Sequence, residues 1–239
     1  MRFETPLHEG VLRARYKRFF ADVETQDGRT ITVHCANTGS MRGCSTTGSR
    51  VAFSLHQKPE RKLPGALELV WCDGQWVGVH PLLANRIVAE ACAAGAIPHF
   101  RGLDVLRREV VVAGCTSRFD LALGVPSADA KEPEWLVEVK SVSWAEQGSG
   151  RFPDAKSARA RRHADELAQL ARAGAKVAML FCVQRSDVHE VQPAWDVDPE
   201  YGHALVAAVA AGVVVAAFSC NVSLEAINLA GELPVVLDR

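Results

Sequence analysis

The chain has 239 residues, of which 48% are hydrophobic and 23% are charged, and its formal net charge at pH 7 is −1. This composition excludes wholesale disorder, and the small net charge excludes a protein that attracts nucleic acid through its whole surface. The charge is uneven, because residues 1–80 hold 11 Lys and Arg against 8 Asp and Glu, whereas residues 81–239 hold 16 against 20. A basic face on the N-terminal part is therefore compatible with the sequence.

The cysteines and the apolar runs indicate a cytoplasmic protein. None of the seven cysteines forms a C-x-x-C pair, which argues against a zinc ribbon, and most lie in apolar stretches, as buried thiols do in a reducing compartment. The first ten residues lack the apolar core of a signal peptide. The longest apolar run, residues 204–218, is shorter than the roughly 20 residues that span a bilayer. We expect a helix that ends at Gly212 and a buried strand after it, with no membrane association.

Residues 1–80 have the pattern of short strands joined by turns. Residues 10–25 predict one long strand, and residues 30–35 alternate apolar and polar side chains as a strand does. Asp27-Gly28 and Asp73-Gly74 are typical of hairpin turns. Further strands are expected at residues 50–57 and on both sides of the second turn. Several short strands without a convincing helix favour an OB-like β-barrel over residues 1–80.

The pattern changes at Pro81, where helices begin to alternate with strands. Helices are predicted over residues 82–95, from Asp154 as N-cap to Gly174, and over residues 199–212. Strands are predicted over residues 104–112, 117–125, 135–142, 176–184 and 213–222, with a loop at residues 145–154. This order implies a mixed-sheet α/β domain over residues 81–239.

The stretch EWLVEVKSV, residues 134–142, carries an acid and a base on one face of its strand. Glu138 and Lys140 share that face, and Asp120 on the preceding strand converges with Glu138 if the two strands form a hairpin that keeps Phe119 on the opposite face. Two adjacent carboxylates repel each other and favour a hard divalent cation such as Mg²⁺. Such an ion polarises a phosphoryl oxygen, and a lysine beside it stabilises developing charge. The constellation suits phosphodiester hydrolysis.

Less specific explanations compete with this hypothesis. An amphipathic strand can carry Glu138 and Lys140 on a solvent-exposed face without any function. Glu90, on the first predicted helix, could supply a third carboxylate, or it could form an ordinary surface pair with Arg86 four residues earlier.

Basic residues interleaved with aromatic ones indicate nucleic-acid binding, although the aromatics could equally be core. On the second long helix, Arg159, Arg162 and His163 share one side, which is either a solvated face or a phosphate-contacting one. The loop NTGSMRGC lacks the Gly-Lys-Ser/Thr ending of a phosphate-binding NTPase loop, but Asn37 and Arg42 could contact a phosphate. The full set of nucleic-acid-binding candidates is Arg13, Lys17, Arg18, Asn37, Arg42, Arg61, Lys62, Arg159 and Arg162.

Five stretches together resemble the sugar fermentation stimulation protein A (SfsA) family over nearly the whole chain: RYKRFFADVE, HCANTGSMRGC, SRFDLAL, VEVKSV and GRFPDAKSARARRHADEL. The resemblance implies an N-terminal OB-like barrel and a C-terminal PD-(D/E)XK nuclease-like domain. It also implies DNA binding without sequence specificity and a regulatory link to sugar metabolism, notably maltose.

The nuclease motif of that family maps onto three residues of this chain. The resemblance implies that Asp120, Glu138 and Lys140 are catalytic, and that Asp120 and Glu138 bind Mg²⁺ or Mn²⁺ together with Glu90. The chain departs from the pattern where Arg118 and Phe119 replace a proline-containing turn before the first acid.

Two hypotheses follow from these residues. One is a Mg²⁺-dependent nuclease that acts on DNA or RNA, and the other is a DNA-binding regulatory factor without catalysis, whose acidic site is vestigial. The intact set of Asp120, Glu138 and Lys140 favours the nuclease, and the lack of a helix-turn-helix or basic zipper argues against a sequence-specific regulator.

Overall fold

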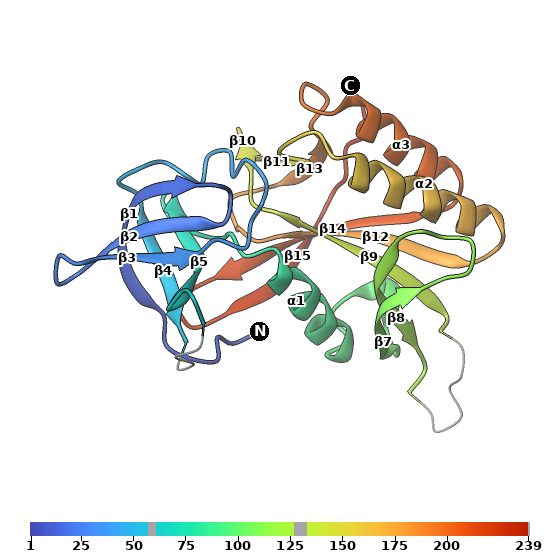
Figure 1. Ribbon diagram of the computed structural model, residues 1–239. Coiled ribbons are helices and arrows are strands. Elements are labelled where there is room, and N and C mark those ends of the chain that lie inside the picture. The colour runs from blue at the N-terminus through green and yellow to red at the C-terminus, as the bar shows by residue number, and fades with distance from the viewer. Residues whose placement is uncertain (57–60, 127–132, 239) are drawn as a thin grey trace.

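Two β-rich units lie side by side in the computed structural model, which describes residues 1–56, 61–126 and 133–238 (Figure 1). In these described residues the first six strands form one sheet, and the remaining strands, with three α-helices, form the second unit. The predicted architecture of an OB-like barrel followed by a mixed-sheet α/β unit is confirmed.

The first sheet closes into a five-stranded barrel. Its strand order is β3-β2-β1-β4-β5-β6, and an additional pairing of β3 with β5 closes it, while β6 extends β5 at one edge. Alternating apolar side chains such as Leu12, Val23, Val33 and Phe53 fill the interior. The strands are β1 (His8–Tyr16), β2 (Phe20–Thr25), β3 (Thr30–His34), β4 (Arg50–Leu55), β5 (Gly65–Cys72) and β6 (Gln75–Gly78).

The single long strand predicted over residues 10–25 is wrong, because the chain reverses between β1 and β2. Tyr16 pairs with Phe20, and Lys17 and Arg18 between them have positive φ angles of 48° and 63°. The turn contains no Gly or Asn, the usual residues for this conformation, so the sequence carried no turn signal. The hairpins predicted at Asp27-Gly28 and Asp73-Gly74 are both present.

The second unit is a six-stranded mixed sheet in the order β15-β14-β12-β9-β8-β7, with β12 parallel to both its neighbours. Helix α1 covers one face and helices α2 and α3 cover the other (Figure 1). The helices are α1 (Leu82–Ala93), α2 (Ala158–Arg172) and α3 (Pro199–Ala210), with a 3₁₀ turn at Pro98–Phe100. The strands are β7 (Asp104–Val111), β8 (Arg118–Gly124), β9 (Trp135–Val142), β12 (Lys176–Val183), β14 (Val214–Val222) and β15 (Ile227–Leu233).

Some predicted boundaries differ from the structure. The loop expected at residues 145–154 contains β10 (Ala145–Glu146) and β11 (Ser149–Phe152), which form a small sheet with β13 (Glu190–Pro193). The N-cap of α2 is Ser157, whose hydroxyl accepts a hydrogen bond from the Ala160 N–H, and not Asp154. As expected, Gly212 follows the end of α3 and precedes β14. In the described part of the chain, no helix has the length and apolarity needed to cross a membrane.

Direct contacts fix the barrel against the α/β unit. The Arg2 backbone forms a bridge with Ala226, so the first residues of the chain pack on the α/β unit although the sequence assigned them to the barrel. The buried Arg185 guanidinium, just after β12, lies 2.8 Å from the Asp73 carboxylate of the β5–β6 turn and also donates to the Ser143 carbonyl at 3.0 Å. A site between the units is therefore held by both.

Candidate metal and nucleic-acid site

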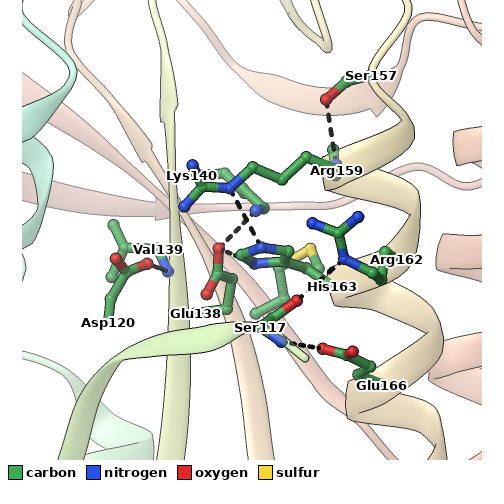
Figure 2. Close-up of polar contacts among 12 residues, drawn as sticks. Ser117, Asp120, Glu138, Val139, Lys140, Ser157, Arg159, Arg162, His163 and Glu166 are labelled. Carbon is green, nitrogen blue, oxygen red and sulfur yellow. Dashed lines mark hydrogen bonds and ion pairs between the residues drawn. The ribbon is translucent and has the colours of Figure 1, made fainter. Parts of the chain in front are cut away.

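Asp120 and Glu138 meet where strands β8 and β9 separate. The β8–β9 ladder pairs Leu121 with Val137, and no further pair follows toward Asp120. Asp120 therefore takes over as hydrogen-bond partner of the β9 backbone, because its Oδ2 accepts from the Val139 N–H at 2.7 Å. Asn85 of α1 donates to the other oxygen at 2.6 Å. Figure 2 shows Asp120 beside β9 at the level of Val139, with Glu138 close by.

The Glu138 side chain is buried, with only 3% of its surface exposed, and Lys140 is buried beside it. Lys140 Nζ donates to Glu138 Oε1 at 2.6 Å, and His163 Nδ1 lies 2.5 Å from the same oxygen (Figure 2). The second oxygen, Oε2, is buried and has no hydrogen-bond partner in the described part of the chain. The solvent-exposed strand face considered for this pair is therefore wrong.

The two carboxylates have opposite pKa shifts. Burial raises the pKa of Asp120, and the negative charge of Glu138 raises it further, to about 7, although hydrogen bonds from Val139 and Asn85 act in the opposite direction. Burial also acts to raise the pKa of Glu138, but the hydrogen bond from His163 and the charge of Lys140 outweigh it and lower the pKa below its ordinary value. Neighbouring acids whose pKa values are shifted in opposite directions are typical of a functional site.

These residues fit a hard divalent cation. The unpartnered Glu138 Oε2 and the Asp120 carboxylate supply oxygen atoms, which Mg²⁺ and Mn²⁺ prefer. No group of three or more His, Cys, Asp or Glu side chains close enough to hold a metal occurs in residues 1–56, 61–126 and 133–238. A cation here would have two protein carboxylates and would complete its shell with water and substrate oxygens, as Mg²⁺ usually does.

The structure pairs Glu90 with groups other than Asp120 and Glu138, and its role as a third ligand stays a prediction. Its carboxylate pairs with Arg86 at 3.3 Å and with the Met1 amino group at 2.9 Å, and about half of the side chain is exposed. Glu90 thus forms the surface pair with Arg86 that was the alternative. Helix α1 directs Asn85, and not Glu90, toward Asp120.

The acidic pair lies in a groove of about 420 Å³ that residues from both units line. Lys140 shares its floor with the two carboxylates. The barrel contributes Arg18, Asn37, Thr38 and Gly39, and the stretch from β11 to the first turn of α2 contributes Arg151, Lys156, Ser157 and Arg159. Cations from two directions thus surround the buried Glu138 and the half-buried Asp120, which suits a polyanion whose backbone passes over a metal site.

The structure brings only some of the predicted nucleic-acid contacts to this groove. Arg18, Asn37 and Arg159 line it, and Lys17 is adjacent to Arg18 in the β1–β2 turn. The Arg159 Nε also donates to His163 Nε2 at 3.3 Å. Arg162 lies on the same side of α2, but its Nε donates to the Ser117 hydroxyl at 3.4 Å.

Other predicted contacts lie elsewhere. The Arg13 guanidinium pairs with Glu24 at 2.8 Å on the barrel surface. Arg42 does not line the groove itself, but it stacks over the ring of Trp144, a groove-lining residue, at 5.0 Å. Arg61 contacts His56 at 3.1 Å and lines a separate pocket, so it and the adjacent Lys62 do not contribute to the groove.

The glycine-containing loop between β3 and β4 is fixed by side chains. The Asn37 side-chain oxygen accepts the Gly39 N–H at 2.9 Å, and Asp154 Oδ2 accepts the Met41 N–H at 2.8 Å. Arg15 donates to the carbonyls of Asn37 and Gly39, both at 2.7 Å. Because two of its amides are already bonded, the loop shapes the groove wall more than it offers amides to a phosphate.

Sequence reasoning missed His163 and Asn85 as parts of the site. His163 was placed on the basic side of α2, yet it is buried beside Ala160, Ala164 and Leu167 of the apolar face. Its position at the border of that apolar face was the available signal. Lys156 and Arg151 were missed because their proximity to the acids depends on the path of the chain between β11 and α2.

Comparison with known proteins decides the family. Residues 14–79 match the model of the SfsA N-terminal OB domain, and residues 82–226 match the model of the sugar fermentation stimulation protein RE domain. The chain belongs to the sugar fermentation stimulation protein (SfsA) family. The SfsA family resemblance noted in the sequence is thereby confirmed.

Relatives in the SfsA family match along their whole length. The sugar fermentation stimulation protein homolog of Alkalilimnicola ehrlichii is 50% identical, over 98% of this chain and 99% of the relative. The homolog of Pseudomonas aeruginosa is 46% identical, over 99% of this chain and 100% of the relative. The structure of Pyrococcus furiosus SfsA in complex with Ca²⁺ superimposes with a TM-score of 0.87 at 26% identity, covering 99% of this chain and 98% of that one.

Proposed function

We propose that this SfsA family member is a divalent-metal-dependent nuclease that cleaves DNA or RNA without sequence specificity. One observation carries the proposal: Glu138 keeps a buried, unpartnered oxygen next to Asp120. Burial and the negative charge of Glu138 raise the pKa of Asp120 to about 7. Two neighbouring carboxyl groups with one oxygen left unpartnered favour a bound cation. Its place on the floor of a groove with basic walls supports an anionic polymer as the substrate.

Asp120 and Glu138 would hold Mg²⁺ or Mn²⁺. The cation, when bound, would polarise a phosphoryl oxygen and lower the pKa of a bound water. Pyrococcus furiosus SfsA forms a complex with Ca²⁺, another hard cation that takes oxygen ligands, and this supports a divalent cation in the present chain.

The other residues of the site orient groups and bind phosphate. Asn85 and the Val139 N–H fix the Asp120 carboxylate, and His163 fixes Glu138 through Oε1. Lys140 can turn its ammonium from Glu138 toward the scissile phosphate and stabilise the charge that develops there. Arg18, Lys156 and Arg159 would contact the phosphates on either side.

The alternative is a DNA-binding regulatory factor linked to sugar metabolism. One contact favours it, because the ion pair between Lys140 and Glu138 at 2.6 Å partly compensates the Glu138 charge without any metal. In that case the groove would bind nucleic acid without cutting it.

A cleavage assay separates the two functions. Purified protein is incubated with labelled single- and double-stranded DNA and RNA in Mg²⁺, Mn²⁺ or EDTA. The nuclease should cut in the presence of metal, lose cleavage in Asp120→Asn and Glu138→Gln, and keep it in Glu90→Gln, a carboxylate control outside the groove. If the wild-type protein cuts no substrate with either ion, the binding function stands. If Glu138→Gln cuts as the wild type does, the activity lies elsewhere.

A further inference from the structure

Two aromatic side chains are exposed at the end of the β1–β2 hairpin. Tyr16 is 40% exposed and Phe19 is 47% exposed, and in the described part of the chain no other Phe, Tyr or Trp is exposed to this degree. The closed end of this hairpin points toward the α/β unit (Figure 1). Arg18, between the two aromatics in sequence, lines the groove that holds Asp120 and Glu138.

The backbone of this turn adopts a conformation that its residues disfavour. Lys17 and Arg18 have positive φ angles of 48° and 63°, which Gly or Asn would adopt at less cost. Backbone positions of this kind cluster at active sites and ligand-binding sites, where the surrounding structure holds them in place. The turn thus presents two cations and two aromatic rings at once.

The Tyr16 ring is held in place by the barrel. It stacks on Phe20 with ring centroids 5.5 Å apart, and its hydroxyl donates to Asp22 at 3.2 Å. A fixed ring loses little conformational entropy when a planar ligand packs on it. Tyr16 therefore offers a fixed ring at the tip.

An exposed aliphatic side chain lies on the groove wall that α1 forms. Leu82, the first residue of α1, is 72% exposed and lines the same groove as Arg18 and Lys140. Contacts to phosphates need cations and amides, and they gain nothing from exposed Leu, Phe or Tyr side chains. Apolar groups beside a cationic groove indicate a ligand that offers flat apolar faces as well as phosphates.

We propose that the hairpin tip is a base-stacking platform and that the groove accepts a single-stranded nucleic acid. An unpaired base stacks on Phe19 or Tyr16, Leu82 contacts a neighbouring base, and Arg18 binds the phosphate between them. A duplex cannot make these contacts, because its base faces are already stacked on one another. This inference rests on the proposed function for the identity of the groove as a cleavage site, and it adds the strand preference.

A binding experiment without metal tests the platform. Binding of the wild-type protein to a labelled single-stranded oligonucleotide and to the duplex of the same sequence is measured in EDTA, where the proposed cleavage cannot occur. We expect tighter binding of the single strand. Phe19→Ala should weaken single-strand binding about tenfold or more, the scale of one lost base–aromatic stack. Phe19→Trp should restore it, and duplex binding should change little.

Controls separate stacking from general damage to the fold. Val206→Ala removes an exposed apolar group from α3, outside the groove lining, and should bind both substrates as the wild type does. Equal or tighter binding of the duplex, or wild-type single-strand binding by Phe19→Ala, would overturn the inference. Because binding is measured without metal, a failure to cleave any substrate counts against the nuclease only. Metal-dependent cleavage of duplex in preference to single strand counts against the platform only.

Discussion

The His163 imidazole and the Glu138 carboxylate meet at 2.5 Å, although they come from helix α2 and strand β9, 25 residues apart. His163 is 2% exposed, and its Nε2 accepts from Arg159. His163 Nδ1 and Lys140 Nζ both contact Glu138 Oε1, so Oε2 has no hydrogen-bond partner among the described residues. His163 thereby orients the carboxylate so that one oxygen remains available to a cation.

Replacement of His163 by Ala should weaken metal use. We expect metal affinity or the metal-dependent cleavage rate to fall about 10- to 100-fold, as when other outer-shell partners of metal ligands are lost. Nucleic-acid binding in EDTA should change little. His163→Asn, which keeps a donor near Glu138, should recover part of the loss. Cleavage rates measured across a Mg²⁺ titration check this, and identical curves for His163→Ala and the wild type would contradict it.

Metal affinity should depend on pH through Asp120. Burial and the Glu138 charge raise its pKa from 3.8 to about 7, so the folded protein retains this proton up to neutral pH and must release it to bind a cation. Metal affinity should therefore fall as the pH drops through 7. In metal-free buffer, ionisation of Asp120 should lower the free energy of unfolding as the pH rises from about 4 to 7. A salt-bridged acid has the opposite effect, because its ionised form stabilises the fold.

Calorimetric titration of Mn²⁺ between pH 6 and 8 measures the dependence on pH. The affinity of the wild-type protein should rise over this range, and Glu90→Gln should follow it. A constant affinity over the range would show that Asp120 is not a ligand.

The salt dependence of binding should separate groove cations from other surface cations. Arg18→Gln combined with Lys156→Gln should make the log–log salt slope shallower by about 0.7 per lost phosphate contact on single strands. Arg13→Gln should leave the slope unchanged, because Glu24 already pairs with that guanidinium. Affinities measured at several salt concentrations give the slopes. If Arg13→Gln made the salt slope shallower and the Arg18→Gln/Lys156→Gln variant did not, the binding surface would lie on the outer barrel.

Glu166 of α2 should stabilise the fold without contributing to the site chemistry. Its buried carboxylate accepts hydrogen bonds from the Thr116 and Ser117 N–H groups and from the Thr116 hydroxyl, at 2.7 to 3.1 Å, just before β8 begins. Burial acts to raise the pKa of Glu166, but the side chains and backbone N–H groups of Ser117 and Thr116 lower it to about 2. The contribution to stability should thus be complete above about pH 4.5 and be lost as the pH falls toward 2.

Glu166→Gln should lower the free energy of unfolding by about 1–3 kcal/mol, the cost of disrupting buried hydrogen bonds to a charged group. The neighbouring Asp165 is exposed, so Asp165→Asn should stay within about 0.5 kcal/mol of the wild type. Urea unfolding at pH 7 measures both. Equal midpoints for the two variants would show that the Glu166 contacts do not stabilise the start of β8.

The sequence predicted those features that depend on local patterns. The Asp27-Gly28 and Asp73-Gly74 hairpins were predictable because their residues suit tight turns. The convergence of Asp120 and Glu138 was predictable because β8 and β9 are consecutive. The side-chain alternation of β8 was not predictable, because Phe119 packs toward α2 while Leu121 packs toward α1. The alternation breaks at Asp120, where the ladder between β8 and β9 ends.

Features that depend on distant contacts were not predictable. The positive φ angles of Lys17 and Arg18 have no residue signature, because only the surrounding barrel fixes them. The burial of His163 depends on a carboxylate that β9 brings beneath α2. Glu90 was assigned from the family pattern, but the rotation of α1 directs Asn85 to Asp120 instead.

The proposed nuclease site requires that Asp120 and Glu138 bind one divalent cation at the groove floor. The most direct test is anomalous diffraction from crystals of the wild-type protein and of Glu138→Gln, both soaked in Mn²⁺. We expect a Mn²⁺ peak in the wild type about 2.0–2.3 Å from Glu138 Oε2 and from an Asp120 oxygen, near the Mg²⁺–oxygen range, and no such peak in Glu138→Gln. A wild-type crystal with Mn²⁺ bound elsewhere and none between these carboxylates would show that Asp120 and Glu138 are not the metal ligands.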